Sequence, residues 1–326
     1  MMAASIRFAR LRLRARLDSS IVADIMSHIL TLVSSTPEKP LTDSHIKEVL
    51  GIAAYYNLEK TGKPVWLSKK KAADIPLSDK PGIALSAHLR ETLAPAKIDL
   101  FVTSAENRRK KLLLADMDST IVRGETLDEL AAHAGLQEKV SEITKAAMEG
   151  KLDFQAALRE RVSLLKGLGT EALERTLEET RLNEGAETLV KVMAGAGATC
   201  VLVSGGFTFF TGPVAEQAGF HHHHGNILEM DGDALSGTVA EPILDRHAKV
   251  DFLNRYSADL GLEKHDTLTI GDGANDIPML KSAGLGIGYR PKNAVADAIG
   301  NLIMHGDLRA ALYAQGYTDK EIKRFS

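Results

Sequence analysis

Three short apolar runs stand out in the chain, and each ends abruptly in polar or flexible residues. They cover residues 112–115, 199–203 and 267–270, and none contains a charged side chain. Runs of this length without a charged interruption are typical of strands buried on both faces. We therefore predict an α/β fold built on a parallel sheet that helices cover on both sides.

The stretch between the first two runs has a helical period instead. Thr126 and Glu129 have the spacing of a capping box, which predicts a helix beginning at Thr126. About four short helices placed after the first strand of a sheet are best explained as an inserted cap over the strand ends, which closes a site against water. Apolar residues recur at helical spacing over residues 127–134, 140–148, 154–165 and 173–182.

The first hundred residues alternate between strand and helix patterns. Arginine and apolar residues alternate over residues 10–17, which predicts a strand and argues against a targeting peptide. Ile21, Ile25, Ile29 and Val33 recur at four-residue steps and predict a helix over residues 18–34. A small N-terminal α/β domain is the expected result. Its other predicted elements are helices over residues 45–58 and 82–93 and strands over residues 65–67 and 98–102.

Two conspicuous runs of similar side chains have ordinary interpretations. The lysines at residues 69–71 are interpreted as a solvated helix start rather than a nucleic-acid patch. The four histidines at residues 221–224 precede a predicted hairpin at residues 229–237. Neighbouring residues of an extended chain point to opposite sides and no cysteine lies nearby, so a solvated loop is favoured over a metal cluster.

Composition limits the number of domains and the kinds of partner. At 326 residues the chain suggests about two domains, with room for an insertion in one of them. We expect an N-terminal domain over residues 1–105, a catalytic core over residues 106–126 plus 183–326, and a cap over residues 127–182. The content of 44% hydrophobic and 25% charged residues, with a formal net charge of -3, indicates no attraction to nucleic acid or to an anionic membrane. No apolar run approaches the roughly 18 residues of a membrane span, and the single cysteine, Cys200, cannot form an intrachain disulfide, which favours a reducing cytoplasm.

Candidate chemistry begins where the first apolar run ends. Asp116 and Asp118 follow it with one residue between them, and open parallel sheets build their sites at that end of their strands. Two carboxylates so close repel each other unless a cation or a shared proton relieves them. The pair is therefore a candidate metal site, or a nucleophile with its acid, although an isolated pair of this kind is more often a solvated acidic turn.

The ends of the other two runs supply further parts of a site. Ser204 is followed by two glycines before a predicted helix, an arrangement that suits a phosphate because free amides and the helix dipole favour an anion. Asp272 leaves the third run, and Asp276 follows it after a glycine turn. Hard oxygen ligands in this number favour Mg²⁺ over zinc.

These residues, with Lys249, resemble the four ordered motifs of haloacid dehalogenase superfamily phosphatases. Within the superfamily, the chain is similar to the phosphoserine phosphatases over about residues 112–302. The similarity is carried by residues 116–125, 148–154, 161–165 and 271–280. It implies a Rossmann-like core with an inserted helical-bundle cap, and it allows a regulatory, ACT-like role for the N-terminal domain.

The resemblance also implies a role for each motif. Asp116 is the expected nucleophile, forming an aspartyl-phosphate, and Asp118 the expected general acid and base. The Asp116 side chain, the Asp118 backbone carbonyl and Asp272 are the expected Mg²⁺ ligands, with Asp276 orienting them. The phosphoryl oxygens are expected to contact Ser204, the Gly205 amide and Lys249.

Family correspondence places the substrate's amino acid end at the cap. Glu125 is expected to pair with its ammonium group, and Arg161 to bind its carboxylate. Asn275 is expected to help bind the substrate. Phe154 and Met148 would be apolar walls, although packing within the cap is a substantial alternative for both.

The expected function is hydrolysis of O-phosphoserine to serine and phosphate, the last step of L-serine biosynthesis. One alternative is a phosphotransferase or a small-metabolite phosphatase of the same superfamily. A non-catalytic serine-binding regulator is a second alternative, disfavoured because each catalytic position is filled. The expected partner is thus a small molecule, with no nucleic acid or membrane, and a homodimer is allowed.

Overall fold

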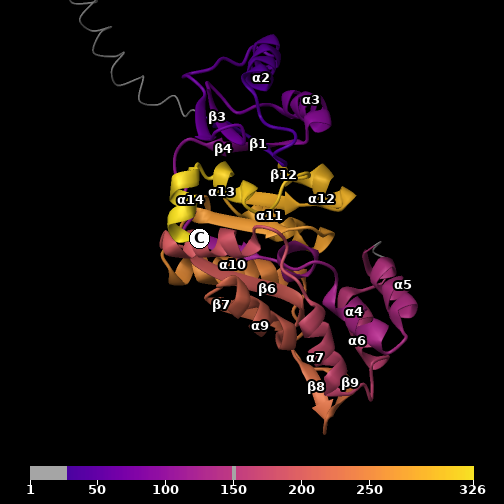
Figure 1. Ribbon diagram of the computed structural model, residues 1–326. Coiled ribbons are helices and arrows are strands. Elements are labelled where there is room, and N and C mark those ends of the chain that lie inside the picture. The colour runs from indigo at the N-terminus through magenta and orange to yellow at the C-terminus, as the bar shows by residue number, and fades with distance from the viewer. Residues whose placement is uncertain (1–27, 149–151) are drawn as a thin grey trace, which may run out of the picture.

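The computed structural model describes residues 28–148 and 152–326. It has an N-terminal domain, a central core and a helical cap, with the N-terminal domain and the cap at opposite ends of the molecule (Figure 1). The predicted strand over residues 10–17 and the first part of the predicted helix over residues 18–34 lie outside the described residues. None of the described helices is long and apolar enough to cross a membrane.

The core is a six-stranded sheet in the order β12-β11-β10-β5-β6-β7, and every neighbouring pair in it is parallel. The three apolar runs form the adjacent strands β10, β5 and β6, so the predicted parallel α/β core is confirmed. Their carboxyl ends therefore meet at one edge of the sheet. The strands are β5 (Leu112–Ala115), β6 (Thr199–Phe207), β7 (His222–Asn226), β10 (Thr267–Gly271), β11 (Leu285–Tyr289) and β12 (Asn301–Ile303).

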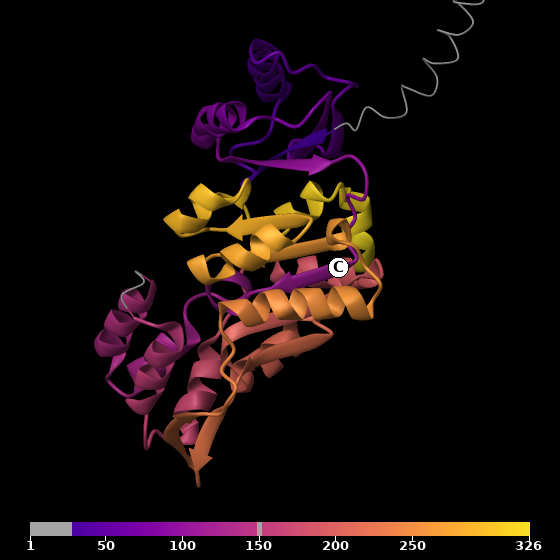
Figure 2. The ribbon, with the colours of Figure 1, turned by 180° about the vertical axis from the view of Figure 1, so that it is seen from behind.

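Helices cover both faces of this sheet, as Figures 1 and 2 show from opposite sides. Leu113 and Ala115 of β5 belong to one buried cluster, and Leu112 and Leu114 belong to another. Alternate residues of the strand thus face opposite helix layers, which is why the apolar run has no polar break. The flanking helices are α8 (Ala186–Gly195), α9 (Thr208–Ala218), α10 (Arg246–Asp259), α11 (Ile277–Ser282), α12 (Asn293–Ala298), α13 (Ala310–Ala314) and α14 (Asp319–Phe325).

The cap is inserted between β5 and β6, as expected, and a two-stranded hairpin supports it. The backbone of Leu235 in the hairpin exchanges hydrogen bonds with Gly167 and Leu168 of the cap. The hairpin and the cap are therefore tied together by backbone contacts. The cap helices are α4 (Thr126–His133), α5 (Gln137–Met148), α6 (Phe154–Ser163) and α7 (Thr170–Glu179), and the hairpin strands are β8 (Leu228–Asp231) and β9 (Ala234–Val239).

The predicted capping box at the start of the cap is wrong. Glu125, not Thr126, is the N-cap residue of α4, and it makes no side-chain cap. The Thr126 hydroxyl donates instead to Asp118 Oδ1, at 2.8 Å. The Thr126 hydroxyl thus bonds to Asp118 instead of capping its own helix.

The N-terminal domain is a four-stranded antiparallel sheet with two helices, in the order β2-β3-β1-β4. The predicted helix over residues 18–34 is wrong at its described end, because residues 28–34 form β1. Four-residue steps also fit a strand, where every second side chain shares a face, and Ile29, Thr31 and Val33 are β-branched. The elements are β1 (His28–Ser34), α2 (Asp43–Tyr55), β2 (Val65–Ser68), β3 (Ala72–Leu77), α3 (Ile83–Leu93) and β4 (Ile98–Ser104).

Both conspicuous side-chain runs are placed differently from the prediction. The lysines at residues 69–71 lie in the turn between β2 and β3, so no helix starts there, and Lys70 has a left-handed backbone with φ 64°. The histidines lie largely in strand β7 rather than in a loop. His224 stacks on Phe252 of α10 with ring centroids 3.9 Å apart, and its Nε2 lies 2.9 Å from the Tyr256 hydroxyl oxygen. Packing against α10 turns this polar segment into an edge strand.

Polar contacts, most of them partly buried, join the N-terminal domain to the core. The Asn301 side chain accepts a hydrogen bond from the Val102 amide and donates one to the Val102 carbonyl, so it pairs with β4 as a strand would. Asp99, which is 3% exposed, accepts hydrogen bonds from the amides of Met304, His305 and Gly306. These contacts fix the outer edge of β4 against β12 and the loop that follows it.

Candidate active site

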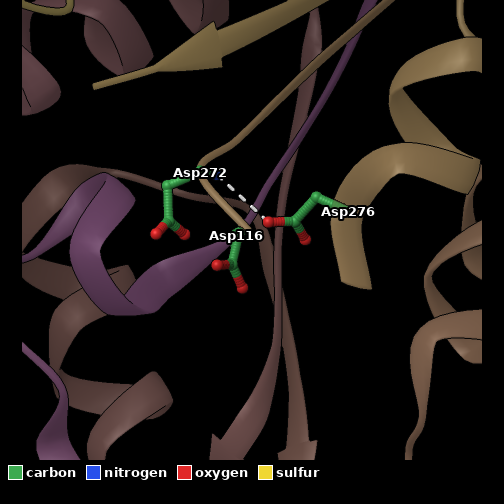
Figure 3. A group of neighbouring side chains, drawn as sticks. All are labelled: Asp116, Asp272 and Asp276. Carbon is green, nitrogen blue, oxygen red and sulfur yellow. Dashed lines mark hydrogen bonds between the residues drawn. The ribbon is translucent and has the colours of Figure 1, made fainter. Parts of the chain in front are cut away.

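Asp116 lies at the end of the central strand, where the site begins. Its backbone amide donates to the Ile270 carbonyl, which continues the pairing of β5 with β10 by one residue beyond the strand. Asp116 is 5% exposed, and its side chain lies beside those of Asp272 and Asp276, which follow β10 (Figure 3). The topology therefore brings together carboxylates that are about 160 residues apart in the sequence.

Lys249 of α10 lies behind these carboxylates and pairs with two of them. Its Nζ is 2.5 Å from Asp116 Oδ1 and 2.6 Å from Asp276 Oδ1. Burial alone would lower the pKa of Lys249, but the carboxylates of Asp116 and Asp276 outweigh it and raise this pKa. Burial, together with the charge of Asp276, raises the pKa of Asp116. Lys249 is thus a buried, protonated cation held against the carboxylates of Asp116 and Asp276.

Asp276 is held by backbone amides on its other oxygen. Asp276 Oδ2 accepts hydrogen bonds from the amides of Asp272 and Gly273, at 3.1 and 3.0 Å. A Cβ atom at Gly271 would lie 2.5 Å from the Asp276 carboxyl carbon, so the close turn needs glycine there. Both oxygens of Asp276 are therefore engaged within the protein, which suits a residue that orients the turn.

Asp116, Asp272 and Asp276 form a set of oxygen donors that could hold a metal ion. One ligand atom from each lies within 4.8 Å of the others. All-oxygen donors of this charge suit a hard divalent cation such as Mg²⁺. Because Lys249 and two amides hold Asp276, the donor set fits a metal whose side-chain ligands are Asp116 and Asp272.

The side chain of Asp118 points away from β5, toward α4 of the cap and the end of β6. Its Oδ1 accepts hydrogen bonds from the Thr126 amide and hydroxyl, and its Oδ2 accepts one from the Ser204 hydroxyl at 3.1 Å. Ser119 adopts a left-handed conformation, φ 54°, in the tight turn that follows. Asn183 donates to the carbonyls of Thr120 and Val122 and fixes this turn.

Ser204 lies beside Asp118 in the last part of β6, and the helix predicted after residues 204–207 is present as α9. Strand β6 continues through Phe207, and α9 begins at Thr208. A Cβ at Gly206 would lie 2.9 Å from Asp118 Oδ2, and one at Gly205 would lie 3.1 Å from Phe154. The two glycines therefore let the end of β6 pass close to the carboxylate and to the cap.

A pocket of about 550 Å³ extends from these carboxylates to the cap. Glu125 lies in its wall and accepts a hydrogen bond from the Ser119 hydroxyl, at 2.9 Å. Burial and the neighbouring Asp118 raise the pKa of Glu125 to about 7. Arg161 of α6 also lines the pocket, donating to the Ala157 carbonyl and to the Thr144 hydroxyl. The pocket thus has carboxylates at its floor and groups of both signs toward the cap.

Most of the predicted site residues line this one pocket. Lys249 and Asp276 are not in its wall, because they are buried directly behind Asp116. The side chain of Met148 lies outside the described residues. The predicted residues that do line it are Asp116, Asp118, Glu125, Phe154, Arg161, Ser204, Gly205, Asp272 and Asn275.

Sequence reasoning missed several residues of the site. Lys292 lines the pocket and contacts both Glu125 and Asp272, yet it is only the extended residue before α12 and belongs to no recognisable motif. Asp128 also lines the pocket and accepts hydrogen bonds from Ser141 and Thr144. Its place in the first turn of a helix is ordinary, so only the cap's packing reveals it.

The chain is similar to known proteins over the segment that holds these residues. A model of the haloacid dehalogenase-like hydrolases matches residues 113–281. The chain is 37% identical over 241 residues to a phosphoserine phosphatase of Streptomyces coelicolor, covering 73% of this chain and 59% of the relative. It is 40% identical over 205 residues to one of Methanocaldococcus jannaschii, covering 63% of this chain and 97% of the relative.

A solved structure extends the likeness to the N-terminal domain. The crystal structure of a haloacid dehalogenase family hydrolase from Salmonella enterica serovar Typhi is 26% identical, with a TM-score of 0.75. The match covers 88% of this chain and 98% of that chain. By contrast, the chain spans somewhat more than half the length of the Streptomyces relative.

Proposed function

The chain belongs to the haloacid dehalogenase-like hydrolases, and from that premise we propose that it hydrolyses O-phosphoserine to serine and phosphate. The observation that carries the proposal is one pocket whose floor holds Asp116 and whose cap side holds Glu125 and Arg161. O-phosphoserine carries a phosphoryl group, an ammonium group and a carboxylate. The pocket offers a nucleophile for the first, an anion for the second and a cation for the third. The names of the relatives support the choice of substrate.

In the proposed reaction, Asp116 attacks the phosphorus and forms an aspartyl-phosphate. Lys249 holds Oδ1 of this carboxylate, which leaves the other oxygen for the attack. The positive charge of Lys249 would also stabilise the negative charge that develops on the phosphoryl oxygens. Ser204 and the Gly205 amide would bind those oxygens from the side of β6.

Asp118 would act as the general acid and then as the general base. It gives a proton to the serine oxygen as the phosphorus–oxygen bond breaks, and later takes one from the water that hydrolyses the aspartyl-phosphate. Its two oxygens are held by Thr126 and Ser204, so its side chain is oriented before the substrate arrives. Because Thr126 begins the cap, the position of the acid is tied to that of the cap.

Mg²⁺ is the proposed cofactor, held by Asp116, Asp272 and the Asp118 backbone carbonyl. When bound, it would screen the charge of the phosphate and so ease the approach of an anionic nucleophile. Asp276 would keep Asp272 in place through the amide contacts of the turn. The geometry of the three carboxylates supports this assignment.

The amino acid end of the substrate would lie against the cap. Glu125 would pair with the ammonium group, Arg161 would bind the carboxylate, and Asn275 would contact the substrate beside the metal ligands. Phe154 borders the same pocket and would supply an apolar wall. Met148 keeps the corresponding role as a prediction from the sequence.

The test is phosphate release from a panel of phosphorylated amino acids and sugars with Mg²⁺. The proposal predicts release from O-phosphoserine with water as the only acceptor. Absence of release without an added hydroxyl acceptor would favour the phosphotransferase alternative, and serine binding without turnover would favour the regulator. The proposal also includes that this reaction produces L-serine in a reducing cytoplasm. It allows the protein to be a monomer or a homodimer.

A further inference from the structure

Lys292 bridges Asp272 and Glu125, the carboxylates to which the proposed function assigns the metal ion and the substrate ammonium. Its Nζ lies 3.2 Å from Asp272 Oδ2 and 3.4 Å from Glu125 Oε1. Asp272 is a proposed metal ligand, and Glu125 is the proposed partner of the substrate ammonium. One side chain of the protein therefore contacts both the metal side and the amino acid side of the pocket.

The fold holds the backbone of Lys292 at this position. The Lys292 amide donates to the Asp272 carbonyl at 3.0 Å, which fixes the residue beside the end of β10. Arg290, two residues earlier, adopts a left-handed backbone with φ 40°, and its amide bonds to the Ile303 carbonyl. A non-glycine residue in this region is uncommon and requires support from its surroundings. The lysine stem thus starts from a fixed point.

The side chain of Lys292, in contrast, is free to leave. It is 42% exposed in the pocket wall, whereas that of Lys249 is 3% exposed. Release of the Lys249 ammonium would strand a buried charge, but release of the Lys292 ammonium returns it to water. Of these two lysines, Lys292 is the one that an incoming cation can displace.

We propose that Lys292 is a resident counter-ion that both the divalent metal and the substrate ammonium displace, so that it couples the binding of the two. This inference rests on the proposed function for the ammonium and on the carboxylate cluster for the metal. A cation at Asp272 repels the lysine, and so does an ammonium group at Glu125. Each ligand therefore favours the same displaced position of the side chain.

The sign of the coupling follows from this common displaced state. Whichever cation binds first carries the cost of moving Lys292, and the second then binds to a pocket that the lysine has already left. Binding of the two is positively cooperative, and the coupling is reciprocal. Without the lysine, binding of the metal does not favour binding of the ammonium group, and the two cations repel each other weakly.

The experiment titrates the full-length protein with Mg²⁺ in a calorimeter, with and without saturating L-serine. Serine carries the ammonium and carboxylate groups but lacks the phosphoryl group through which a substrate would meet the metal directly. The variants are Lys292→Met, which keeps the length of the stem without its charge, and Lys292→Arg, which keeps a cation. Lys191→Met is the matched control, because it removes an exposed lysine contact with Glu187 outside the pocket.

In the wild type, serine should tighten Mg²⁺ binding by about fivefold, at the low end of usual coupling. In Lys292→Met, Mg²⁺ alone should bind about fivefold more tightly than in the wild type, and serine should no longer tighten it. Lys292→Arg should retain the coupling, and Lys191→Met should match the wild type. Circular dichroism of each variant checks that it is folded.

Unchanged Mg²⁺ affinity and unchanged coupling in Lys292→Met would overturn the inference. Weaker binding of inorganic phosphate with unaltered Mg²⁺ affinity would also overturn it, because Lys292 would then be a phosphate ligand. Failure of serine to bind the wild type would instead contradict the amino acid specificity of the proposed function. The Mg²⁺ affinities of Lys292→Met and the wild type would still decide whether the lysine competes with the metal.

Discussion

The ammonium nitrogen of Lys249 lies 2.5 Å from Oδ1 of Asp116, and both side chains are more than nine-tenths buried. The pair is therefore part of the protein's structure as well as of its proposed chemistry. Removing one member leaves the other charge in a region from which water is excluded. Such a loss usually costs more stability than the intact pair contributes.

Lys249→Met should therefore lower the free energy of unfolding by about 3–5 kcal/mol in metal-free buffer, because Asp116 and Asp276 lose their shared cation. Urea denaturation followed by circular dichroism measures it. The double variant with Asp116→Asn should recover part of the loss, since one unpaired carboxylate is then neutral. A loss below about 1 kcal/mol in the single variant would contradict the buried-pair interpretation.

Asp116→Asn should abolish turnover of O-phosphoserine, with kcat at least about 10³-fold lower, because an amide cannot form the acyl-phosphate. Phosphate release measures the change. The amide keeps the shape of the side chain, so the variant should remain folded. Retention of wild-type activity would show that Asp116 is not the nucleophile.

Thr126→Val should lower kcat by about tenfold with little change in KM, because Asp118 loses the hydroxyl donor that orients it but keeps the Thr126 amide. Thr144→Val is the matched change, since it removes the hydroxyl that Arg161 contacts. That variant should instead raise KM. Equal effects of the two variants on kcat and KM would argue against separate roles for the two threonines.

Arg161→Ala should raise KM for O-phosphoserine by about tenfold to 100-fold, the effect of losing one charge-assisted contact. Phosphoethanolamine, which lacks the carboxylate, is the informative second substrate. Wild type and variant should turn it over alike. A comparable loss on both substrates would mean that Arg161 supports the cap rather than the carboxylate.

His224→Phe should weaken the pH dependence of stability in mildly acid solution. Burial against α10 lowers the pKa of His224 to about 4 from its ordinary value near 6.5. The unfolded chain therefore binds the proton more readily, so the neutral ring stabilises the fold above pH 6.5, and this contribution is lost as the pH falls toward 4. Phenylalanine keeps the stacking and removes the titration.

Urea denaturation between pH 4 and 7 measures this difference. The free energy of unfolding of the wild type should fall more steeply with decreasing pH than that of His224→Phe. The same substitution at the exposed His88, in α3 of the N-terminal domain, serves as the control. Parallel curves for wild type and His224→Phe would rule out a role for this histidine in acid sensitivity.

The sequence predicted the core well because burial on two faces leaves a short run without charged residues. Residues 112–115 and 267–270 could hardly be anything but central strands, and Asp116 and Asp272 follow directly from their ends. The helical cap was predictable for a similar reason, since each of its helices has one apolar face. In both cases the pattern arises from the environment that the element occupies.

Other features depend on contacts that no local pattern records. Residues 28–34 lie between two strands, and this pairing overrides the four-residue spacing that suggested a helix. Thr126 bonds to Asp118 rather than capping its own helix, and His224 is accommodated by Phe252 and Tyr256. Lys292 gave no signal because its two partners lie 20 and 167 residues away in the sequence.

The Asn301 contact has a consequence for solubility. An exposed strand edge offers unpaired amides and carbonyls to other chains, and natural proteins cover such edges to avoid aggregation. Here β4 and β12 shield each other's outer edges, with the Asn301 carboxamide completing the pairing to Val102. A protein that lacks the N-terminal domain would expose the edge of β12. Its first defect should therefore be self-association, before any change in phosphatase activity.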